Sequence, residues 1–255
     1  MDSDSMVKNG DKSFNKLFAL VQVIADSAGG MTGKEAAQIA GLPVSTAFRM
    51  LKFLEDRGYL FKTGGRYVLG SGFIHLGLRA REQNPLHRLA HPWLEKLAAQ
   101  TLETVHLATL RGNEVCYYDK VEGRRNVRMG SLIGNFAPVY CTGVGKAILA
   151  FLPKAKQDEI LNSAHRVRFT KNTLVSLKAI RDDLKKISLC GVAVDDCEHE
   201  EGVFCIAAPI LDSMGHAIAG ISLSGSELYL RGNVKALSKQ VLNTACAISN
   251  SYNGR

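Results

Sequence analysis

The apolar positions near the beginning of the chain follow a helical period in three successive segments. In residues 14–27 the apolar stripe consists of Phe14, Leu17, Phe18, Val21 and Ile24. A short second segment follows Thr32, and a third covers about residues 44–57. Apolar residues that recur every three or four positions form one face of a helix. The pattern therefore predicts three helices packed around one small core, preceded by a disordered polar tail over residues 1–13.

The residues between the second and third helices predict a tight turn with defined helix ends. Thr32 and Glu35 have the spacing of a capping box, in which both side chains accept hydrogen bonds from backbone N–H groups at a helix start. Gly41 suits the left-handed backbone that ends a helix. Pro43 suits the start of the next helix, where its missing N–H group costs nothing. The expected order is helix, turn, helix.

The third helix separates apolar and polar residues onto opposite faces. Its apolar arc consists of Ala47, Met50, Leu51 and Leu54, and its outer arc of Ser45, Thr46, Arg49, Lys52 and Phe53. A short helix with hydroxyl and basic side chains suits the major groove of DNA, where arginine can pair with guanine. Amphipathic helices also pack in many proteins that bind no nucleic acid, so this helix pair alone leaves both interpretations open.

A basic hairpin is predicted directly after the third helix. Residues 59–61 and 66–69 have the composition of strands and flank the loop Lys62-Thr63-Gly64-Gly65, whose glycine pair favours a hairpin. In this position a basic hairpin is typical of the wing that lies along DNA phosphates. We therefore predict a winged helix-turn-helix domain over residues 14–70 that binds a double-stranded DNA operator. The predicted DNA-binding residues are Thr32, Lys34, Ser45, Thr46, Arg49, Lys52, Lys62 and Arg66.

The charge of the chain agrees with DNA binding but is weak evidence by itself. The formal net charge is +8 at pH 7, and the isoelectric point is about 9.2. Residues 31–81 contain eight lysines and arginines and three acidic residues, so more than half of the net charge lies in a fifth of the chain. A generally basic surface would give the same total, and only this uneven distribution favours nucleic acid.

The second part of the chain has a different pattern. Residues 71–84 are predicted to form a linker helix that ends at Asn84-Pro85, because proline disfavours helix in the residue before it. Residues 85–255 then mix short apolar strands with helices, which predicts an α+β domain. Helices are expected at 92–102, 143–152, 154–162, 177–188 and 234–251, and strands at 104–110, 114–120, 127–132, 191–195, 205–211 and 217–223.

Four motifs give the chain a resemblance to IclR-family transcription regulators over nearly its full length. One motif is in the N-terminal half, from Gly41 to Tyr59, and the more specific ones cover Thr142–Ala150, Asp195–Ile210 and Ala219–Gly225. The resemblance implies a C-terminal effector-binding domain with a PAS/GAF-like sheet and helices on one side. It also implies a homodimer, or a tetramer on DNA, that acts as a repressor and is switched by a small organic acid or sugar acid. Cys197 and Phe204 depart from the residues common in the family, which leaves the identity of the ligand open.

The predicted effector site is centred on the helix that begins at Gly143-Val144. The free N–H groups and dipole of a helix N-terminus attract a carboxylate, and Gly143 and Gly145 would let the backbone approach a ligand. Ser222 and Ser224 are two positions apart on a strand, so both hydroxyls face the same side. The alternative is that the glycines only pack and the serines face solvent. With the family resemblance, the predicted effector-binding residues are Met129, Ala137, Gly143, Val144, Asp195, Val203, Cys205, Ser222 and Ser224.

The remaining features predict a cytoplasmic protein without a cofactor. The polar N-terminal segment does not have the pattern of a signal peptide, and the chain has no apolar run long enough to span a membrane. The six cysteines at positions 116, 141, 190, 197, 205 and 246 are scattered, without a C-x-x-C pair, and are expected to be reduced. Five of the seven histidines, at positions 87, 91, 106, 165 and 216, are interpreted as surface or packing residues.

Two rival chemistries use residues of the C-terminal domain. Asp195, Cys197, His199 and Cys205 could bind a metal, but their spacing lacks the paired ligands of a structural zinc site. Cys141 or Cys205 could act with His199 as the nucleophile of a small-molecule enzyme, although no local nucleophile signature accompanies either cysteine. We therefore predict a regulator without a metal site or catalytic residues, with a cysteine-dependent enzyme as the alternative.

Overall fold

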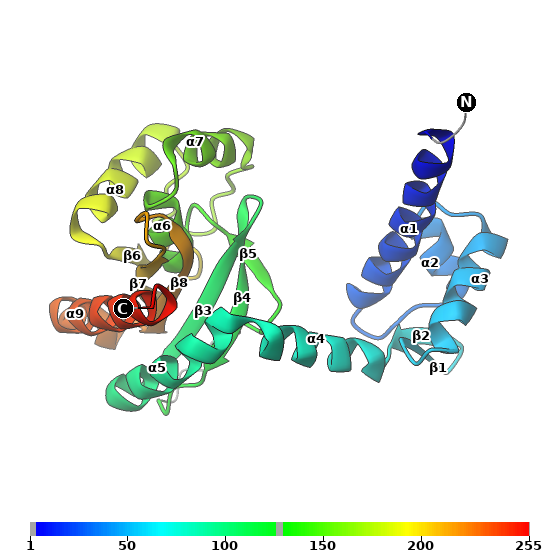
Figure 1. The fold of residues 1–255 in the computed structure, drawn as a ribbon, viewed down its shortest axis with the longest axis horizontal. Coiled ribbons are helices and arrows are strands. Elements are labelled where there is room, and N and C mark those ends of the chain that lie inside the picture. The colour runs from blue at the N-terminus through cyan, green and yellow to red at the C-terminus, as the bar shows by residue number, and fades with distance from the viewer. Residues whose placement is uncertain (1–3, 126–129, 255) are drawn as a thin grey trace. The chain divides into compact units, whose positions relative to one another are not determined.

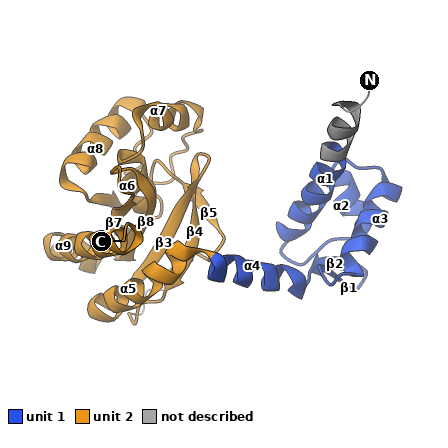
Figure 2. Cartoon of the chain, viewed as in Figure 1, with its two compact units in different colours: residues 1–83 blue, residues 84–255 orange. Residues whose placement is uncertain are grey.

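The computed structural model describes residues 4–125 and 130–254, which form two compact units. Unit 1 is Met1–Gln83 and unit 2 is Asn84–Arg255 (Figure 2). This division lies within one residue of the boundary expected between the linker helix 71–84 and the domain 85–255. Within the described residues, none of the helices combines the length and the apolarity that spanning a lipid bilayer requires.

The first unit is built on the three expected helices, α1 (Asp4–Ala25), α2 (Gly33–Ile39) and α3 (Val44–Glu55). Their core contains the arc that was predicted for the third helix, together with Leu20 and Ile24 of α1. The predicted disordered tail over residues 1–13 is wrong for residues 4–13, because α1 begins at Asp4. Residues 1–3 lie outside the described part of the chain.

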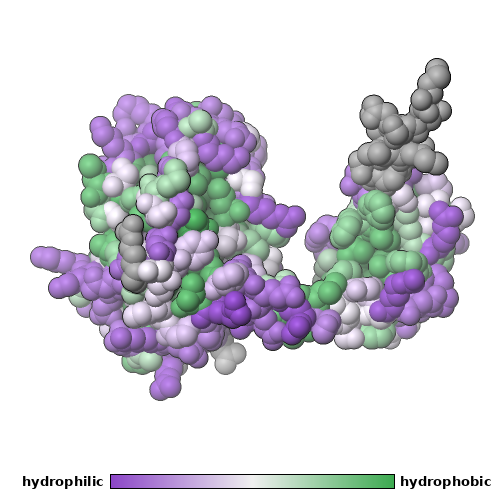
Figure 3. Space-filling model, viewed as in Figure 1, coloured by the Kyte–Doolittle hydropathy of each residue, from purple (hydrophilic) through white to green (hydrophobic). Residues whose placement is uncertain are grey.

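Two apolar residues that were expected in this core are exposed instead. Phe14 and Phe18 of α1 are 65% and 70% exposed. The α1 residues that reach the core are Leu20 and Ile24, with Leu17, Val21 and Val23 partly buried against it. The buried face of α1 is therefore rotated away from Phe14 and Phe18, and Figure 3 shows apolar residues gathered on the visible surface of this unit.

The predicted wing is present as strands β1 (Leu60–Thr63) and β2 (Arg66–Leu69). Thr63 pairs with Arg66, so only Gly64 and Gly65 form the turn. Both glycines have positive φ, 55° and 77°, as a type I′ hairpin turn requires. The hairpin is tied to the rest of the unit by Met31, which forms a bridge with Tyr67 of β2. The linker helix α4 (Ser71–Gln83) follows, and none of its residues is buried.

The second unit is built on a six-stranded antiparallel sheet in the order β5-β4-β3-β8-β7-β6 (Figure 1). The strands are β3 (Thr104–Arg111), β4 (Glu114–Val121), β5 (Phe136–Pro138), β6 (Ala193–Asp196), β7 (Val203–Leu211) and β8 (Ala217–Ser226). Five of these lie close to the expected positions. The strand expected at 127–132 is not found: residues 130–132 are outside any strand, residues 126–129 lie outside the described part, and β5 follows instead.

Helices cover both faces of this sheet, which corrects the expectation of helices on one side. One core contains residues of α5 (Pro85–Thr101) and α9 (Glu227–Tyr252) together with Ile206, Ala208 and Leu223 of the sheet. The other core contains residues of α6 (Gly143–Ala150), α7 (Lys154–Ser163) and α8 (Leu177–Cys190) together with Ala207. Ala207 and Ala208 are adjacent on β7 and therefore point to opposite faces. The fold is α+β: a winged helix-turn-helix followed by a curled, GAF/PAS-like domain.

Candidate functional site

A cavity of about 310 Å³ lies beside the N-terminus of α6 in the second unit. It brings together eight residues that the sequence predicted to bind an effector: Ala137, Gly143, Val144, Asp195, Val203, Cys205, Ser222 and Ser224. Met129, the ninth, lies outside the described residues. These residues come from β5, α6, β6, β7 and β8, so the sheet and α6 assemble the cavity from five separate elements. Their role in binding remains a prediction.

The start of α6 is held close to the sheet by glycine and by a threonine cap. Thr142 is the N-cap residue, and its Oγ1 accepts a hydrogen bond of 3.3 Å from the N–H group of Gly145. A Cβ atom on Gly143 would lie 3.2 Å from Cβ of Cys205, so Gly143 lets the helix N-terminus approach β7. Gly145 has a different role from the one predicted. A Cβ atom there would lie 2.3 Å from the carbonyl oxygen of Val139, so Gly145 accommodates backbone and does not line the cavity.

The strand register explains why the two serines face the cavity together. Ser222 and Ser224 of β8 are 3% and 4% exposed, which excludes the solvent-facing alternative. Ser222 lies opposite His106 of β3, and Ser224 lies between Thr104 of β3 and Cys205 of β7. Asp195 of β6 pairs with Cys205 in turn. Ser224, Cys205 and Asp195 thus form a row of polar side chains across β8, β7 and β6 that lines the cavity.

Several residues that line the cavity were missed by the sequence reasoning, above all His106 and Tyr117. His106 is 3% exposed and faces the cavity, which corrects its interpretation as a surface or packing residue. Burial, with a smaller contribution from Lys120, lowers the pKa of His106 to about 3, so its imidazole is neutral. Burial also raises the pKa of Tyr117 well above its ordinary value. Thr104 lies opposite Ser224 in the sheet, and His106 is two positions further along β3 on the same face. The pairing of β3 with β8 would therefore have indicated His106.

Asp195 is the buried acidic group that lines the cavity, whereas Glu200, which also lines it, is exposed. Its Oδ1 accepts a hydrogen bond of 2.7 Å from the N–H group of Glu198. Burial is the largest influence on this carboxyl and raises the pKa of Asp195 to about 7, with repulsion from Glu198 acting in the same direction. Burial and the neighbouring Asp195 also raise the pKa of the Cys205 thiol. Among the described residues that line the cavity, none is a lysine or an arginine.

The predicted DNA-binding residues lie in the first unit on α2 and its N-cap, on α3 and on the wing. Ser45, Arg49 and Lys52 are exposed on α3, and Thr46 is partly exposed. Lys34 is exposed on α2, and Lys62 and Arg66 are exposed on the wing. Thr32 is occupied in capping: its Oγ1 accepts the N–H of Glu35 at 3.3 Å, and its N–H donates to Oε2 of Glu35 at 2.8 Å. The capping box is therefore confirmed.

Two of these basic side chains have ion-pair or hydrogen-bond partners within the unit, and Nζ of Lys62 lies 5.4 Å from the centre of the Tyr67 ring. Lys52 forms an ion pair of 2.8 Å with Asp56, one helical turn later. Arg66 donates from Nη1 to the carbonyl oxygen of Gly30 at 2.9 Å, and the same nitrogen lies 3.7 Å from Glu35. Arg49 has no carboxylate within ion-pair distance among the described residues. Of the three, Arg49 is the most available for a base edge.

The metal-ligand set considered from the sequence is not assembled by the fold. Where the structure is described, two groups have converging ligand atoms: Asp196, Cys197 and Glu227 in one, and His87, His91 and Asp119 in the other. Neither group contains Asp195, His199 or Cys205. His87, interpreted as a surface or packing residue, is buried.

Comparison with known proteins gives the same two-part architecture. The IclR helix-turn-helix domain matches residues 13–64, and the bacterial transcriptional regulator IclR C-terminal domain matches residues 79–250. The chain belongs to the IclR family of bacterial transcriptional regulators. It is therefore a DNA-binding regulator of transcription, with its helix-turn-helix in unit 1 and the IclR C-terminal domain in unit 2.

Individual relatives extend over almost the whole chain. The transcriptional repressor IclR of Escherichia coli (strain K12) is 31% identical over 248 residues, which is 95% of this chain and 90% of the relative. The structure of Thermotoga maritima IclR has a TM-score of 0.76 and 31% identity, covering 94% of this chain and 98% of that one. An IclR homolog from Microbacterium hydrocarbonoxydans, complexed with 4-hydroxybenzoate, has a TM-score of 0.80 at 23% identity, covers 93% and 98% of the two chains, and shares the fold.

Proposed function

We propose that this IclR-family regulator is a cytoplasmic repressor whose operator binding is controlled by a small carboxylate, such as an organic acid or sugar acid. The observation that carries the proposal is the cavity at the N-terminus of α6, which collects eight predicted effector-binding residues. The Escherichia coli relative is named a repressor, and the Microbacterium homolog binds a carboxylate. The protein is expected to bind its operator as a homodimer or tetramer.

The chemistry of the cavity favours a small anion with hydroxyl groups. Its volume of about 310 Å³ is at the lower end of the range for ligand pockets, about 300–1,000 Å³. The N–H groups at the start of α6 attract a carboxylate by about 0.3–1 kcal/mol when exposed and up to about 2 kcal/mol when partly buried. Ser222 and Ser224 can donate hydrogen bonds to the carboxylate oxygens, and Asp195 can bind a ligand hydroxyl. Hydrogen bonds to a charged group add about 1.5–3 kcal/mol each. After the entropic cost of association is subtracted, the sum is consistent with micromolar affinity, a binding free energy of about −8 kcal/mol.

The electrostatics of the cysteines support a regulator over the alternative enzyme. A thiolate is the nucleophile in cysteine catalysis. Burial raises the pKa of both Cys141 and Cys205, and the negative charge of Asp195 acts in the same direction on each. Both sulfurs therefore remain protonated thiols at neutral pH, which makes them poor nucleophiles.

The test compares operator binding with and without an effector. A duplex is first selected for binding from a random-sequence pool, and small carboxylates are screened by thermal shift, because a ligand that binds only the folded protein raises the melting temperature. The effector should then weaken operator binding in a gel-shift titration. Because coupling is reciprocal, the operator must weaken effector binding by the same factor.

The double variant Ser222→Ala/Ser224→Ala locates the response. It should bind the operator as the wild type does, but lose the effect of the carboxylate. The matched control is Ser188→Ala/Ser213→Ala, which removes two exposed hydroxyls elsewhere in unit 2 and should respond normally. A response of the Ser222/Ser224 variant at the wild-type concentration would place the effector site elsewhere. Consumption of the ligand that depends on Cys205 or Cys141 would favour the enzyme.

A further inference from the structure

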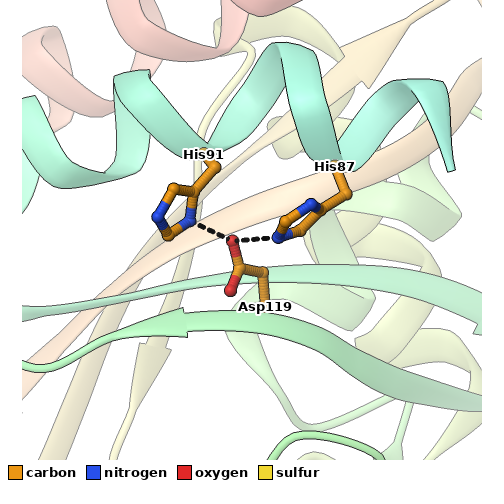
Figure 4. A group of neighbouring side chains, drawn as sticks. All are labelled: His87, His91 and Asp119. Atoms are coloured by element: carbon orange, nitrogen blue, oxygen red, sulfur yellow. Dashed lines mark hydrogen bonds and ion pairs between the residues drawn. The ribbon is translucent and has the colours of Figure 1, made fainter. Parts of the chain in front are cut away.

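His87, His91 and Asp119 form a cluster in unit 2 (Figure 4). Oδ2 of Asp119 lies 2.6 Å from Nδ1 of His91 and 3.1 Å from Nε2 of His87. The side chains of Asp119 and His87 are 1% and 11% exposed, and that of His91 is 33% exposed. None of the three residues lines the effector cavity. Three atoms of the kind that bind transition metals thus converge at a second, largely buried position.

The two histidines are brought together by their spacing on α5. They are four residues apart, so their side chains project from neighbouring turns on one helix face. The helix begins just before them: Oδ1 of Asn84 caps its N-terminus by accepting a hydrogen bond of 2.9 Å from the N–H of Leu86. The helix start fixes the position of the first turns of α5 and therefore of both imidazoles.

Asp119 faces these histidines because of an irregularity in β4. Tyr117 pairs with Ala108 and Asp119 pairs with Leu107, so Tyr118 is an extra residue between two consecutive pairs. Ala108 belongs to the core under α6 and Leu107 to the core under α5 and α9. Regular alternation would point Tyr117 and Asp119 to the same face. The bulge instead turns Asp119 away from the effector cavity and towards α5.

Further contacts orient the members of the cluster. Oδ1 of Asp119 accepts a hydrogen bond of 2.9 Å from the N–H of Lys120, which leaves Oδ2 directed between the two imidazoles. On the outer side of His91, Nε2 lies 3.6 Å from Oε1 of Glu95. A carboxylate near the distal nitrogen of a ligating histidine is a common arrangement in metal sites, where it fixes the orientation of the ring.

We propose that Nε2 of His87, Nδ1 of His91 and Oδ2 of Asp119 bind a divalent transition-metal cation, with Zn²⁺ as the occupant. Imidazole nitrogen and carboxylate oxygen are ordinary zinc ligands, with bonds of about 2.0–2.2 Å. The ligand atoms lie within 4.8 Å of one another, so small side-chain rotations bring them around one ion. Two nitrogen ligands disfavour Mg²⁺ and Ca²⁺, which prefer oxygen. The cation would tie the beginning of α5 to β4.

The second group of possible ligands is a weaker candidate. Asp196 is bound by both terminal nitrogens of Arg231, and Glu227 also accepts from Arg231. A metal at Asp196, Cys197 and Glu227 would have to displace this guanidinium. In the histidine cluster, Oδ2 of Asp119 faces one nitrogen of each imidazole, so all three candidate ligand atoms point to the same place.

The test is direct metal binding by the full chain, purified with its cysteines reduced and stripped with a chelator. Titration with Co²⁺ should give visible d–d absorption that saturates at one ion per chain, without a thiolate charge-transfer band, and Zn²⁺ should abolish the absorption. His91→Asn and Asp119→Asn should weaken binding by more than about 100-fold, since removing even an outer partner of a metal ligand costs about 10–100-fold. His165→Ala, an exposed histidine elsewhere, and Cys197→Ser should bind Co²⁺ normally.

Thermal unfolding with and without Zn²⁺ separates a metal site from a purely structural triad. Zn²⁺ should raise the melting temperature of the wild type and of both control variants, whereas Mg²⁺ should not. For His91→Asn and Asp119→Asn, the effect of Zn²⁺ is the difference from the melting temperature of the same variant in chelator. A loss of intrinsic stability in either variant therefore does not affect the comparison. The proposal is overturned if Co²⁺ gives no d–d bands, if thiolate bands appear, or if Zn²⁺ stabilises His91→Asn as much as the wild type.

Discussion

Nδ1 of His106 lies 3.4 Å from Oγ of Ser224 on the neighbouring strand, while Nε2 of the same ring lies 2.7 Å from Oγ of Ser131. A neutral imidazole has one donor and one acceptor nitrogen, and the lowered pKa of His106 keeps it in this form. His106 can therefore orient the hydroxyl of Ser224 without adding positive charge. Anion recognition in the cavity consequently depends on α6 and the serines. Asp195 is the buried carboxyl of the cavity whose charge changes near neutral pH.

The first prediction is that affinity for a carboxylate effector falls as the pH rises through about 7. Below this pH Asp195 is protonated and can donate a hydrogen bond, whereas above it the ionised carboxylate repels the ligand, because the pKa of Asp195 is about 7. One linked proton changes affinity by at most about tenfold per pH unit. Isothermal titration calorimetry across this range measures the slope. Asp195→Asn should bind with little pH dependence; an equal slope in the variant would assign the effect to another group.

The second prediction concerns stability. Because the pKa of Asp195 is raised from 3.8 to about 7, the folded state binds more protons than the unfolded state in this window, and stability falls as the pH rises through it. Asp195→Asn should remove this loss. One pKa unit corresponds to about 1.4 kcal/mol, so above pH 7 the variant should gain up to roughly 4 kcal/mol in the free energy of unfolding, measured by urea denaturation. The gain should vanish near the lower end of the window.

His106 contributes a second pH dependence to the free energy of unfolding, opposite in direction to that of Asp195. Its pKa is lowered from 6.5 to about 3, so between these values the unfolded state binds the extra proton and stability falls as the pH decreases. In the wild type this trend opposes that of Asp195. In Asp195→Asn it is unmasked, and the variant should lose stability steadily as the pH falls below about 6.5. A flat acidic profile for Asp195→Asn would contradict the burial of a neutral His106.

The sequence predicted the helix-turn-helix well because its signals are local. The capping box at Thr32, the glycine turn of the wing and the apolar arc of α3 each depend on residues that are close in sequence. The apolar face of α1 was harder to assign. Its apolar residues surround more than half of the helix, so the period alone does not decide whether Phe18 or Leu20 meets the core.

The residues of the effector cavity that lie in the family motifs were predicted. Those that reach the cavity only through the pairing of distant strands were missed. Ser222 and Ser224 share a face by simple alternation, but His106 joins them only because β3 pairs with β8 across more than a hundred residues of sequence. Asp119 shows the same limit in another way. Alternation along β4 assigns it to the face of Tyr117, and only the bulge at Tyr118 reverses that assignment.

The third prediction is that Arg66 stabilises the wing in addition to any contact with phosphate. Arg66→Ala removes the hydrogen bond from Nη1 to the carbonyl oxygen of Gly30 and should cost about 0.5–1.5 kcal/mol of stability. Arg66→Lys keeps the charge but not the guanidinium geometry, so it should retain more DNA affinity than Arg66→Ala while remaining destabilised. Lys34→Ala, which removes an exposed lysine of α2 in the same unit, should leave unfolding unchanged within about 0.5 kcal/mol. Equal stability of Arg66→Ala and wild type would refute this role.

The last prediction separates base reading from phosphate binding on the DNA-binding unit. Arg49 is exposed on α3 without a nearby carboxylate among the described residues, so Arg49→Ala should cost about 1–3 kcal/mol on the selected operator and relax specificity at one base pair. Lys62→Ala should weaken binding to all duplexes alike and reduce the salt dependence by about one phosphate contact, a slope change of about 0.9.

Gel-shift titrations at several salt concentrations, on the operator and on a scrambled duplex, measure both effects. Lys235→Ala removes an exposed lysine from α9 in the other unit and serves as the matched control, with affinity and salt slope expected to match the wild type. If Arg49→Ala binds the operator as tightly as the wild type, α3 is not the helix that reads the bases. If it instead loses affinity equally on both duplexes, Arg49 binds phosphate and the specificity resides in Ser45, Thr46 or another residue of the outer face.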